Sequence, residues 1–151
     1  MELQIKTLCG KQCAGTNDDL SFTFCNSGQC CSTNGIQLTN GRQIESNCNV
    51  VDCNAPDIFG SSQIGDCNDF EFGSESIITG KVTLSNNDGF RGEWVKFRKA
   101  DGSLYQCTID GWIDGDNNIP NENHVPKYRD FSCYRLSKYR VSQCKMTNIK
   151  S

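Results

Sequence analysis

Apolar and polar side chains alternate through much of the sequence, and this period of two restricts the fold more than any other feature. The alternation is clear in residues 3–7, 20–24 and 78–84, and it recurs at 95–97 and 105–109. In a β-strand such a pattern places every second side chain on the same face. No segment carries the i, i+3, i+4, i+7 spacing of an amphipathic helix over three turns.

Turn-forming residues separate the alternating segments. Asp101-Gly102 predicts a short hairpin, and 14 glycines together with many Asn and Asp residues break every long segment. We predict strands near 3–8, 19–25, 29–38, 46–53, 64–72, 77–85, 91–99 and 103–113. With 151 residues the chain is one domain of ordinary size. The pattern therefore predicts an all-β fold, an antiparallel eight-stranded β-sandwich.

Eleven cysteines indicate where such a domain resides. Reducing compartments keep thiols free, so this density predicts several disulfides and a secreted, extracellular protein. A metal site is disfavoured because the cysteines form no repeated Cys-x2-Cys pairs and the chain has a single histidine. An odd count leaves at least one cysteine without a partner in the same chain. A disulfide between two copies of the chain, which would give a covalent dimer, is therefore one expectation. The disulfide candidates are Cys9, Cys13, Cys25, Cys30, Cys31, Cys48, Cys53, Cys67, Cys107, Cys133 and Cys144.

The charge is unevenly distributed. Residues 1–119 hold 8 Lys or Arg against 16 Asp or Glu, whereas residues 120–151 hold 7 against 2. An acidic body with a short basic tail is unlike a nucleic-acid-binding protein, which presents a dominant basic face. No stretch approaches the roughly 20 apolar residues of a transmembrane helix.

Two loops rich in Asn and Asp follow or precede predicted strands. The first is Asn17-Asp18-Asp19 and the second is Asn86-Asn87-Asp88. Calcium takes six to eight oxygen ligands from carboxylates, amides and backbone carbonyls, and these loops supply such groups. The alternative is that the same side chains only cap turns by bonding nearby backbone groups. Both interpretations remain open at this stage.

Three stretches, taken in order, resemble the PLAT (LH2) domain of lipoxygenases, lipases and polycystin-type proteins. The first is Ala14-Gly15-Thr16-Asn17-Asp18 before the strand at 20–24. The second is the strand at 78–85, the loop Asn86-Asn87-Asp88-Gly89 and the Trp94 strand. The third is Tyr105-x-Cys107 followed by Gly111-Trp112-Ile113-Asp114. The resemblance implies a PLAT or C2-like sandwich over residues 1–116. Residues 117–151 are then a basic, cysteine-containing C-terminal extension packed on the same domain.

The resemblance also implies a set of calcium ligands. Calcium-binding members use the equivalents of the Gly15 carbonyl, the Asp88 side chain and the Gly89 carbonyl, with an acidic residue before the Ala-Gly-Thr. That acidic position is Cys13 here, and the usual Asp is Asn17. The possible Ca²⁺ site is therefore formed by Gly15, Asn17, Asp18, Asp88 and Gly89. A second family site is rejected because residues 38–43 contain no carboxylate.

The sequence offers no case for an enzyme. His124, the only histidine, lies in a polar loop between prolines and has no nucleophile motif near it. The carboxylate pairs Asp66/Asp69 and Glu71/Glu75 are better explained as a solvated acidic face. Glycine-rich phosphate loops followed by helices are absent, so no organic cofactor is expected.

Surface contacts are expected at aromatic residues in loops. Phe59 and Phe90 are candidates for exposure, because each lies beside turn-forming residues and could touch a lipid surface. The alternative is that they are buried under the loops. The PLAT resemblance implies that one or both of Trp94 and Trp112 belong to the core. The basic and aromatic tail from Lys127 to Arg140 could hold anionic surfaces or neutralise the acidic body.

These observations favour a secreted, non-enzymatic binding module that engages a lipid surface or an extracellular protein, with calcium as a possible aid. One alternative is a structural or adhesive extracellular-matrix protein that is crosslinked through the odd cysteine. Another is a small toxin or lipase-type subunit.

Overall fold

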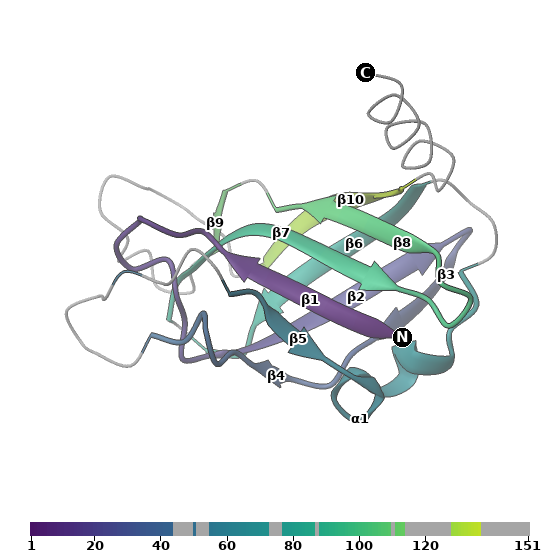
Figure 1. Cartoon of the computed structure of the whole chain (residues 1–151), viewed down its shortest axis with the longest axis horizontal. Helices are drawn as coiled ribbons and strands as arrows, with labels where there is room; N and C mark the ends of the chain where they lie inside the picture. Colours follow the sequence, from purple (N-terminus) through teal and green to yellow (C-terminus); the bar gives the residue numbers. More distant parts are fainter. Residues whose placement is uncertain are drawn as a thin grey trace, which may run out of the picture.

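The computed structural model of the chain describes residues 1–43, 50, 55–72, 77–86, 88–109, 111–113 and 128–136. Within these ranges the chain forms short antiparallel strands and two brief helical segments (Figure 1). The helical segments are α1 (Ser61–Ile64) and η1 (Gly65–Asp69), and neither is long and apolar enough to cross a bilayer. The strands are β1 (Glu2–Thr7), β2 (Asp19–Asn26), β3 (Gln29–Ser32), β4 (Ile36–Gln37), β5 (Asp57–Phe59), β6 (Ile77–Leu84), β7 (Phe90–Arg98), β8 (Leu104–Thr108), β9 (Trp112–Ile113) and β10 (Tyr128–Arg135).

Eight of these strands form one hydrogen-bonded path in the order β3-β2-β6-β10-β8-β7-β1-β5. The two short strands β4 and β9 attach to β2 and β7 respectively. Each pairing along the path is antiparallel. The prediction of an antiparallel all-β fold is therefore confirmed.

The sheet curls until its two halves face each other across a core of aromatic rings. Phe24 of β2 and Phe97 of β7 have ring centroids 4.9 Å apart, although three strands separate β2 from β7 along the path. Only a closed or sandwich-like arrangement can bring them together. Phe97 also stacks on Tyr105, and Phe131 meets Phe24 edge to face. Burial of rings of this size is the largest favourable term in such a core.

The pattern of burial explains why alternation identified these strands. In β6 the residues Ile78, Gly80, Val82 and Leu84 are buried, whereas the residues between them are exposed or half-buried. One face of each strand therefore packs on the core while the other faces solvent. The hairpin predicted at Asp101-Gly102 joins β7 to β8, and Gly102 adopts a φ of +88° that favours glycine.

The segment 64–72 was expected to be a strand, and this expectation is wrong. It begins with the end of α1 and all of η1. A 3-10 helix has three residues per turn, so Ile64, Cys67 and Phe70 lie on one side and pack against the core. Cys67 is fully buried and bonded to Cys31 of β3. The apolar residues here thus follow a period of three that resembles a short strand in sequence.

Two other expected strands differ in extent. The strand expected at 29–38 divides into β3 and β4, both of which pair with β2. At the break, the Thr33 hydroxyl accepts a hydrogen bond from the backbone N–H of Phe22 and so replaces a regular ladder bond. The strand expected at 46–53 falls almost entirely outside the described residues.

Residues 128–135 of the C-terminal extension form β10, which lies between β6 and β8. Its Cys133 is directly opposite Cys107 of β8 and forms a disulfide with it. Phe131 of the same strand enters the aromatic core. This part of the extension is therefore an inner strand of the sheet.

Candidate functional site

The two Asn- and Asp-rich loops lie side by side at one end of the sheet. The backbone N–H of Ser85 donates to the carbonyl of Asp19 at 3.0 Å, and that of Arg91 donates to the carbonyl of Ala14 at 2.9 Å. The structure therefore brings together the first loop and the described residues of the second. Asn87 lies outside the described residues.

The carboxylates of these loops hold the backbone of the opposite loop. Asp18 Oδ2 accepts hydrogen bonds from the N–H groups of Asn86 and Asp88 at 3.0 and 3.1 Å. In return, Asp88 Oδ2 accepts one from the N–H of Asn17 at 2.5 Å. This reciprocal arrangement matches the turn-capping interpretation. Within the described ranges, no cluster of three or more His, Cys, Asp or Glu side chains could hold a metal ion. Calcium binding here stays a prediction.

Gly15 of the expected calcium set is required by packing. A Cβ on Gly15 would lie 2.6 Å from the carbonyl oxygen of Gly41. The backbones at these two residues can therefore approach this closely only because residue 15 has no side chain. The same carbonyl accepts a hydrogen bond from Thr16 N–H at 2.9 Å. Gly89 is buried directly before β7.

A third loop is organised by a carboxylate that the sequence analysis did not single out. Asp57 is 4 % exposed, and its two oxygens accept hydrogen bonds from the N–H groups of Thr39, Asn40 and Gly41 at 2.7–2.9 Å. Because all three donors come from consecutive residues, Asp57 fixes the turn at 39–41 against β5. Its only sequence signal is its place after Pro56, which is a weak one.

Phe59 and Phe90 are not surface contacts, and that expectation is corrected. Phe90 is fully buried and Phe59 is 8 % exposed. Phe59 lies opposite Leu3 across the β1–β5 pair, on the core side of β5. Its neighbour Ile58 points outward and is 61 % exposed. Phe90 begins β7 instead of ending the loop, so the alternation of the strand directs it inward.

The two tryptophans occupy different environments. Trp112 is buried beside Ala14, as expected. Trp94 is half-buried, and the ammonium group of Lys96 lies 4.3 Å from its ring centroid. Trp94 therefore lies outside the core, against the side chain of a neighbouring outward-facing lysine.

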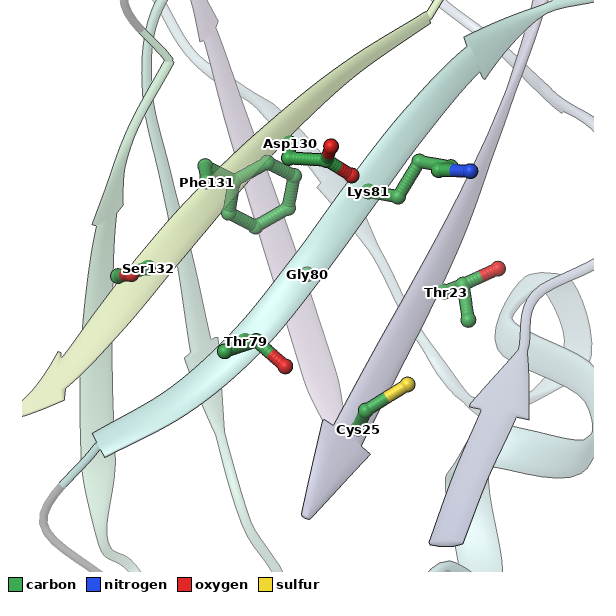
Figure 2. Close-up of a pocket in the computed structure, with 8 residues that line it drawn as sticks. All are labelled: Thr23, Cys25, Thr79, Gly80, Lys81, Asp130, Phe131 and Ser132. Carbon is green, nitrogen blue, oxygen red and sulfur yellow. The ribbon is translucent and has the colours of Figure 1, made fainter. Parts of the chain in front are cut away.

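A hollow of about 570 Å³ opens on the solvent face of β2, β6 and β10 (Figure 2). We call it the outer-face hollow. Thr79 and Lys81 are exposed on β6, and the buried residues between and beyond them face the core. The hollow is lined by Thr23, Cys25, Thr79, Gly80, Lys81, Asp130, Phe131 and Ser132.

Strand register explains the shape of the outer-face hollow. Cys25, Thr79 and Ser132 lie opposite one another in one row across the three strands. These three side chains are small, so the surface along this row is recessed relative to its surroundings. Gly80 adds no side chain on the core side, where the Phe131 ring takes its place: a Cβ on Gly80 would lie 2.4 Å from that ring.

The charges in the outer-face hollow balance. Lys81 and Asp130 are register partners on β6 and β10, and they are the charged residues of the lining. Hydroxyl groups surround them, including Thr23 Oγ1, which lies 3.0 Å from Ser32 Oγ of β3. The surface can donate and accept hydrogen bonds with little net charge.

Large side chains stand at both ends of the outer-face hollow. Tyr134 is 57 % exposed and lies opposite Ile77, which is 49 % exposed. Towards the other end, Tyr128 is 45 % exposed, and Lys81 Nζ lies 4.5 Å from its ring centroid. Both tyrosines belong to β10. In the sequence they are part of the basic and aromatic tail, and no local pattern indicates their partners on β6.

All eight cysteines in the described ranges are disulfide-bonded. The assigned pairs are Cys25–Cys30, Cys31–Cys67 and Cys107–Cys133. Cys48, Cys53 and Cys144 lie outside the described residues. The covalent dimer stays a prediction. A band at twice the monomer mass on a non-reducing gel would confirm it.

The carboxylates considered for catalysis lie at the surface wherever the structure describes them. Asp66, Asp69 and Glu71 are exposed. Asp69 and Glu71 line a smaller hollow of about 380 Å³ near the N-terminus, together with Lys99 and Asp101. Glu75 and His124 lie outside the described residues.

The outer-face hollow was missed because its signal is spread over distant segments. The outward positions Thr23 and Cys25 are visible as the polar half of an alternating strand, as are Thr79 and Lys81. That β10 completes the surface depends on the strand order, which no local pattern contains. Comparison with models of known protein families and with curated proteins finds no match.

Proposed function

We propose that the protein is an extracellular, non-enzymatic binding module of the PLAT-like type, and that it binds its ligand in the outer-face hollow. The hollow itself is the observation that carries the proposal. It is concave, it lies on three adjacent strands, and it combines hydrogen-bonding groups with exposed aromatic rings at its ends. Concave surfaces with a few convergent polar groups are the usual location of ligand sites.

The disulfides support the extracellular part of the proposal. Cys107–Cys133 and Cys31–Cys67 join segments 26 and 36 residues apart, and their cysteines are buried. Bonds of this kind persist in oxidising compartments. They also hold β10 against β8 and η1 against β3, so the hollow is built on a rigid scaffold.

A partner at the surface is better supported than an anchor in a bilayer. The aromatic residues expected to enter lipid, Phe59 and Phe90, belong to the core. The exposed apolar and aromatic side chains at the ends of the outer-face hollow are Ile77, Tyr134 and Tyr128, and polar residues adjoin them. This surface is therefore better suited to a macromolecule in aqueous solution than to the interior of a bilayer.

The proposal is tested by filling the hollow. Thr79→Arg places a long side chain on the low central row, at an exposed position that the core does not need. Glu93→Arg is the matched control on the outer face of β7. Wild type and both variants are measured against printed glycans, phospholipid vesicles and matrix proteins. We expect Thr79→Arg to remove the binding that wild type shows and Glu93→Arg to retain it. Binding that survives Thr79→Arg contradicts the proposal.

The calcium component has a separate test. An ion held between the loops raises the melting temperature on addition of millimolar Ca²⁺, because it binds only the folded state. Asp88→Asn then removes the increase. If Ca²⁺ leaves the melting temperature unchanged, Asp18 and Asp88 act as turn-capping residues alone.

A further inference from the structure

We propose that the outer-face hollow binds an extended, uncharged oligosaccharide, which lies along β10 between Tyr134 and Tyr128. This inference rests on the proposed function and names the ligand class of the same site. A sugar ring has apolar C–H faces and a rim of hydroxyl groups. A matching protein surface therefore combines exposed aromatic rings with paired donors and acceptors.

The two tyrosines define the length of the site. Tyr128 and Tyr134 occupy outward positions on the same strand, six residues apart. At about 3.3 Å per residue this separation is about 20 Å, which is the length of several linked sugar rings. About half of the surface of each tyrosine is exposed to solvent. The contact of Lys81 with one face of Tyr128 holds that ring in place.

The surface between the tyrosines is polar and low. Thr79 and Ser132 are direct neighbours across β6 and β10, and Thr23 lies one row further along on β2. Each hydroxyl can donate one hydrogen bond and accept two, so it can bind a sugar hydroxyl in either direction. The strands that carry them are hydrogen-bonded to one another, so the groups are positioned before a ligand arrives.

The charges favour a neutral ligand. Lys81 and Asp130 are opposite each other and cancel. An ammonium group that donates and a carboxylate that accepts are together suited to hydroxyl groups on adjacent carbons. An acidic glycan or a phospholipid headgroup would gain from Lys81 but meet the carboxylate of Asp130.

A peptide that adds as a further strand does not fit this surface. The base of the hollow is β6, which is paired with β2 on one side and with β10 on the other. No free backbone edge is therefore offered by β6 at the base, whereas strand addition requires one.

The test is titration calorimetry of the intact protein with cellohexaose, xylohexaose, mannohexaose and chitohexaose. We expect at least one hexasaccharide to bind, at least about tenfold more tightly than its disaccharide. Tyr134→Ala and Tyr128→Ala should each weaken binding about tenfold, as the loss of an aromatic anchor does. Thr79→Arg should abolish it. Ile58→Ala, an exposed apolar residue on β5, is the control and should change affinity less than about twofold.

Salt dependence separates a neutral from a charged ligand. Raising NaCl from about 50 to about 500 mM should change the affinity less than about twofold, because screening acts only on charge pairs. Melting temperatures of all variants establish that they fold. The inference is overturned if no hexasaccharide binds, or if binding survives both Tyr134→Ala and Thr79→Arg. If Thr79→Arg instead removes binding to vesicles or matrix proteins, the sugar assignment fails and the proposed function stands. If wild type binds none of these probes, both fail.

Discussion

At the scale of single residues, buried or bridging carboxylates organise the loops of this protein. Asp57 receives three consecutive backbone N–H groups, while Asp18 and Asp88 each hold the opposite loop. A backbone donor left without a partner in a buried position is costly, so a carboxylate that satisfies several at once is strongly stabilising. Asp residues that suggest ion binding in sequence can therefore serve the backbone instead.

Asp57→Ala should lower the free energy of unfolding by about 3 kcal/mol, because it leaves three N–H donors without their acceptor, and that of Gly41 is buried. Asp57→Asn, which keeps one good acceptor, should cost less. Chemical denaturation measures both. Asp101→Ala, at an exposed carboxylate that accepts from Ser103 N–H at 2.8 Å, is the matched control and should cost far less. Equal losses at Asp57 and Asp101 would refute the role given to burial.

The hairpin residue Asp101 yields a prediction on pH. Hydrogen bonds from the backbone N–H and the hydroxyl of Ser103, more than the charge of Lys99, hold the pKa of Asp101 below its ordinary value of 3.8. A lowered pKa means that this stabilisation is complete above pH 3.8 and is lost as pH falls through the folded-state pKa. An NMR titration should give a midpoint below 3.8 that Lys99→Ala shifts only slightly. A large shift in Lys99→Ala would make the ion pair the main cause.

At the scale of elements, β6 and β10 form the central pair on which the outer-face hollow is built. Gly80 and Phe131 face each other across this pair, and the ring covers the glycine. Such cover compensates for the absence of a side chain in the middle of a strand. The same ring meets Phe22 and Phe24 edge to face, so the pair links the sheet to the core.

Gly80→Ala should destabilise the protein by about 1–3 kcal/mol, because the added methyl group lies within contact distance of a packed ring. Phe131→Leu should also destabilise it. The double variant should lose less than the sum of the two single losses, since the smaller side chain makes room for the methyl. Thermal or denaturant unfolding of the four proteins completes the cycle. Additive losses would show that Gly80 and Phe131 do not interact.

At the scale of the whole molecule, curling of the sheet and the disulfides determine the arrangement. The curl brings Phe24 against Phe97, and Cys107–Cys133 joins the two halves of the path where β10 meets β8. Cys31–Cys67 ties the helical segment η1 to the strand β3. Cys25–Cys30 closes only the β2–β3 hairpin.

Replacing both cysteines of a disulfide by alanine should cost more stability when the disulfide closes a longer loop, with a logarithmic dependence on loop length. Loops of 26 and 36 residues predict about 3–4 kcal/mol for Cys107–Cys133 and Cys31–Cys67. The 5-residue separation of Cys25–Cys30 predicts about 2 kcal/mol, and this pair of a half-buried and an exposed cysteine is the control. Denaturation midpoints compare the variants. An equal loss for the short and the long loops would contradict the loop-length account.

The amino-acid sequence by itself determined the strands with clear alternation, such as β1, β2, β6 and β7, and the turn at Asp101-Gly102. These features depend on neighbours a few residues away, so a local pattern contains them. The helical segment after Gly60 was missed because a period of three over a few apolar residues resembles a short strand. The Asn- and Asp-rich loops suggested turn capping as one of two interpretations, but not that each carboxylate bonds the backbone of the opposite loop.

Only the tertiary structure decided which strands are neighbours, and with that the site. Thr23, Thr79 and Ser132 are far apart in sequence and form one surface because β10 inserts between β6 and β8. The same packing directs Phe59 and Phe90 into the core and gives Asp57 its three donors. Burial and register are properties of contacts between distant segments, and the free energy that selects them comes from the closed core as a whole.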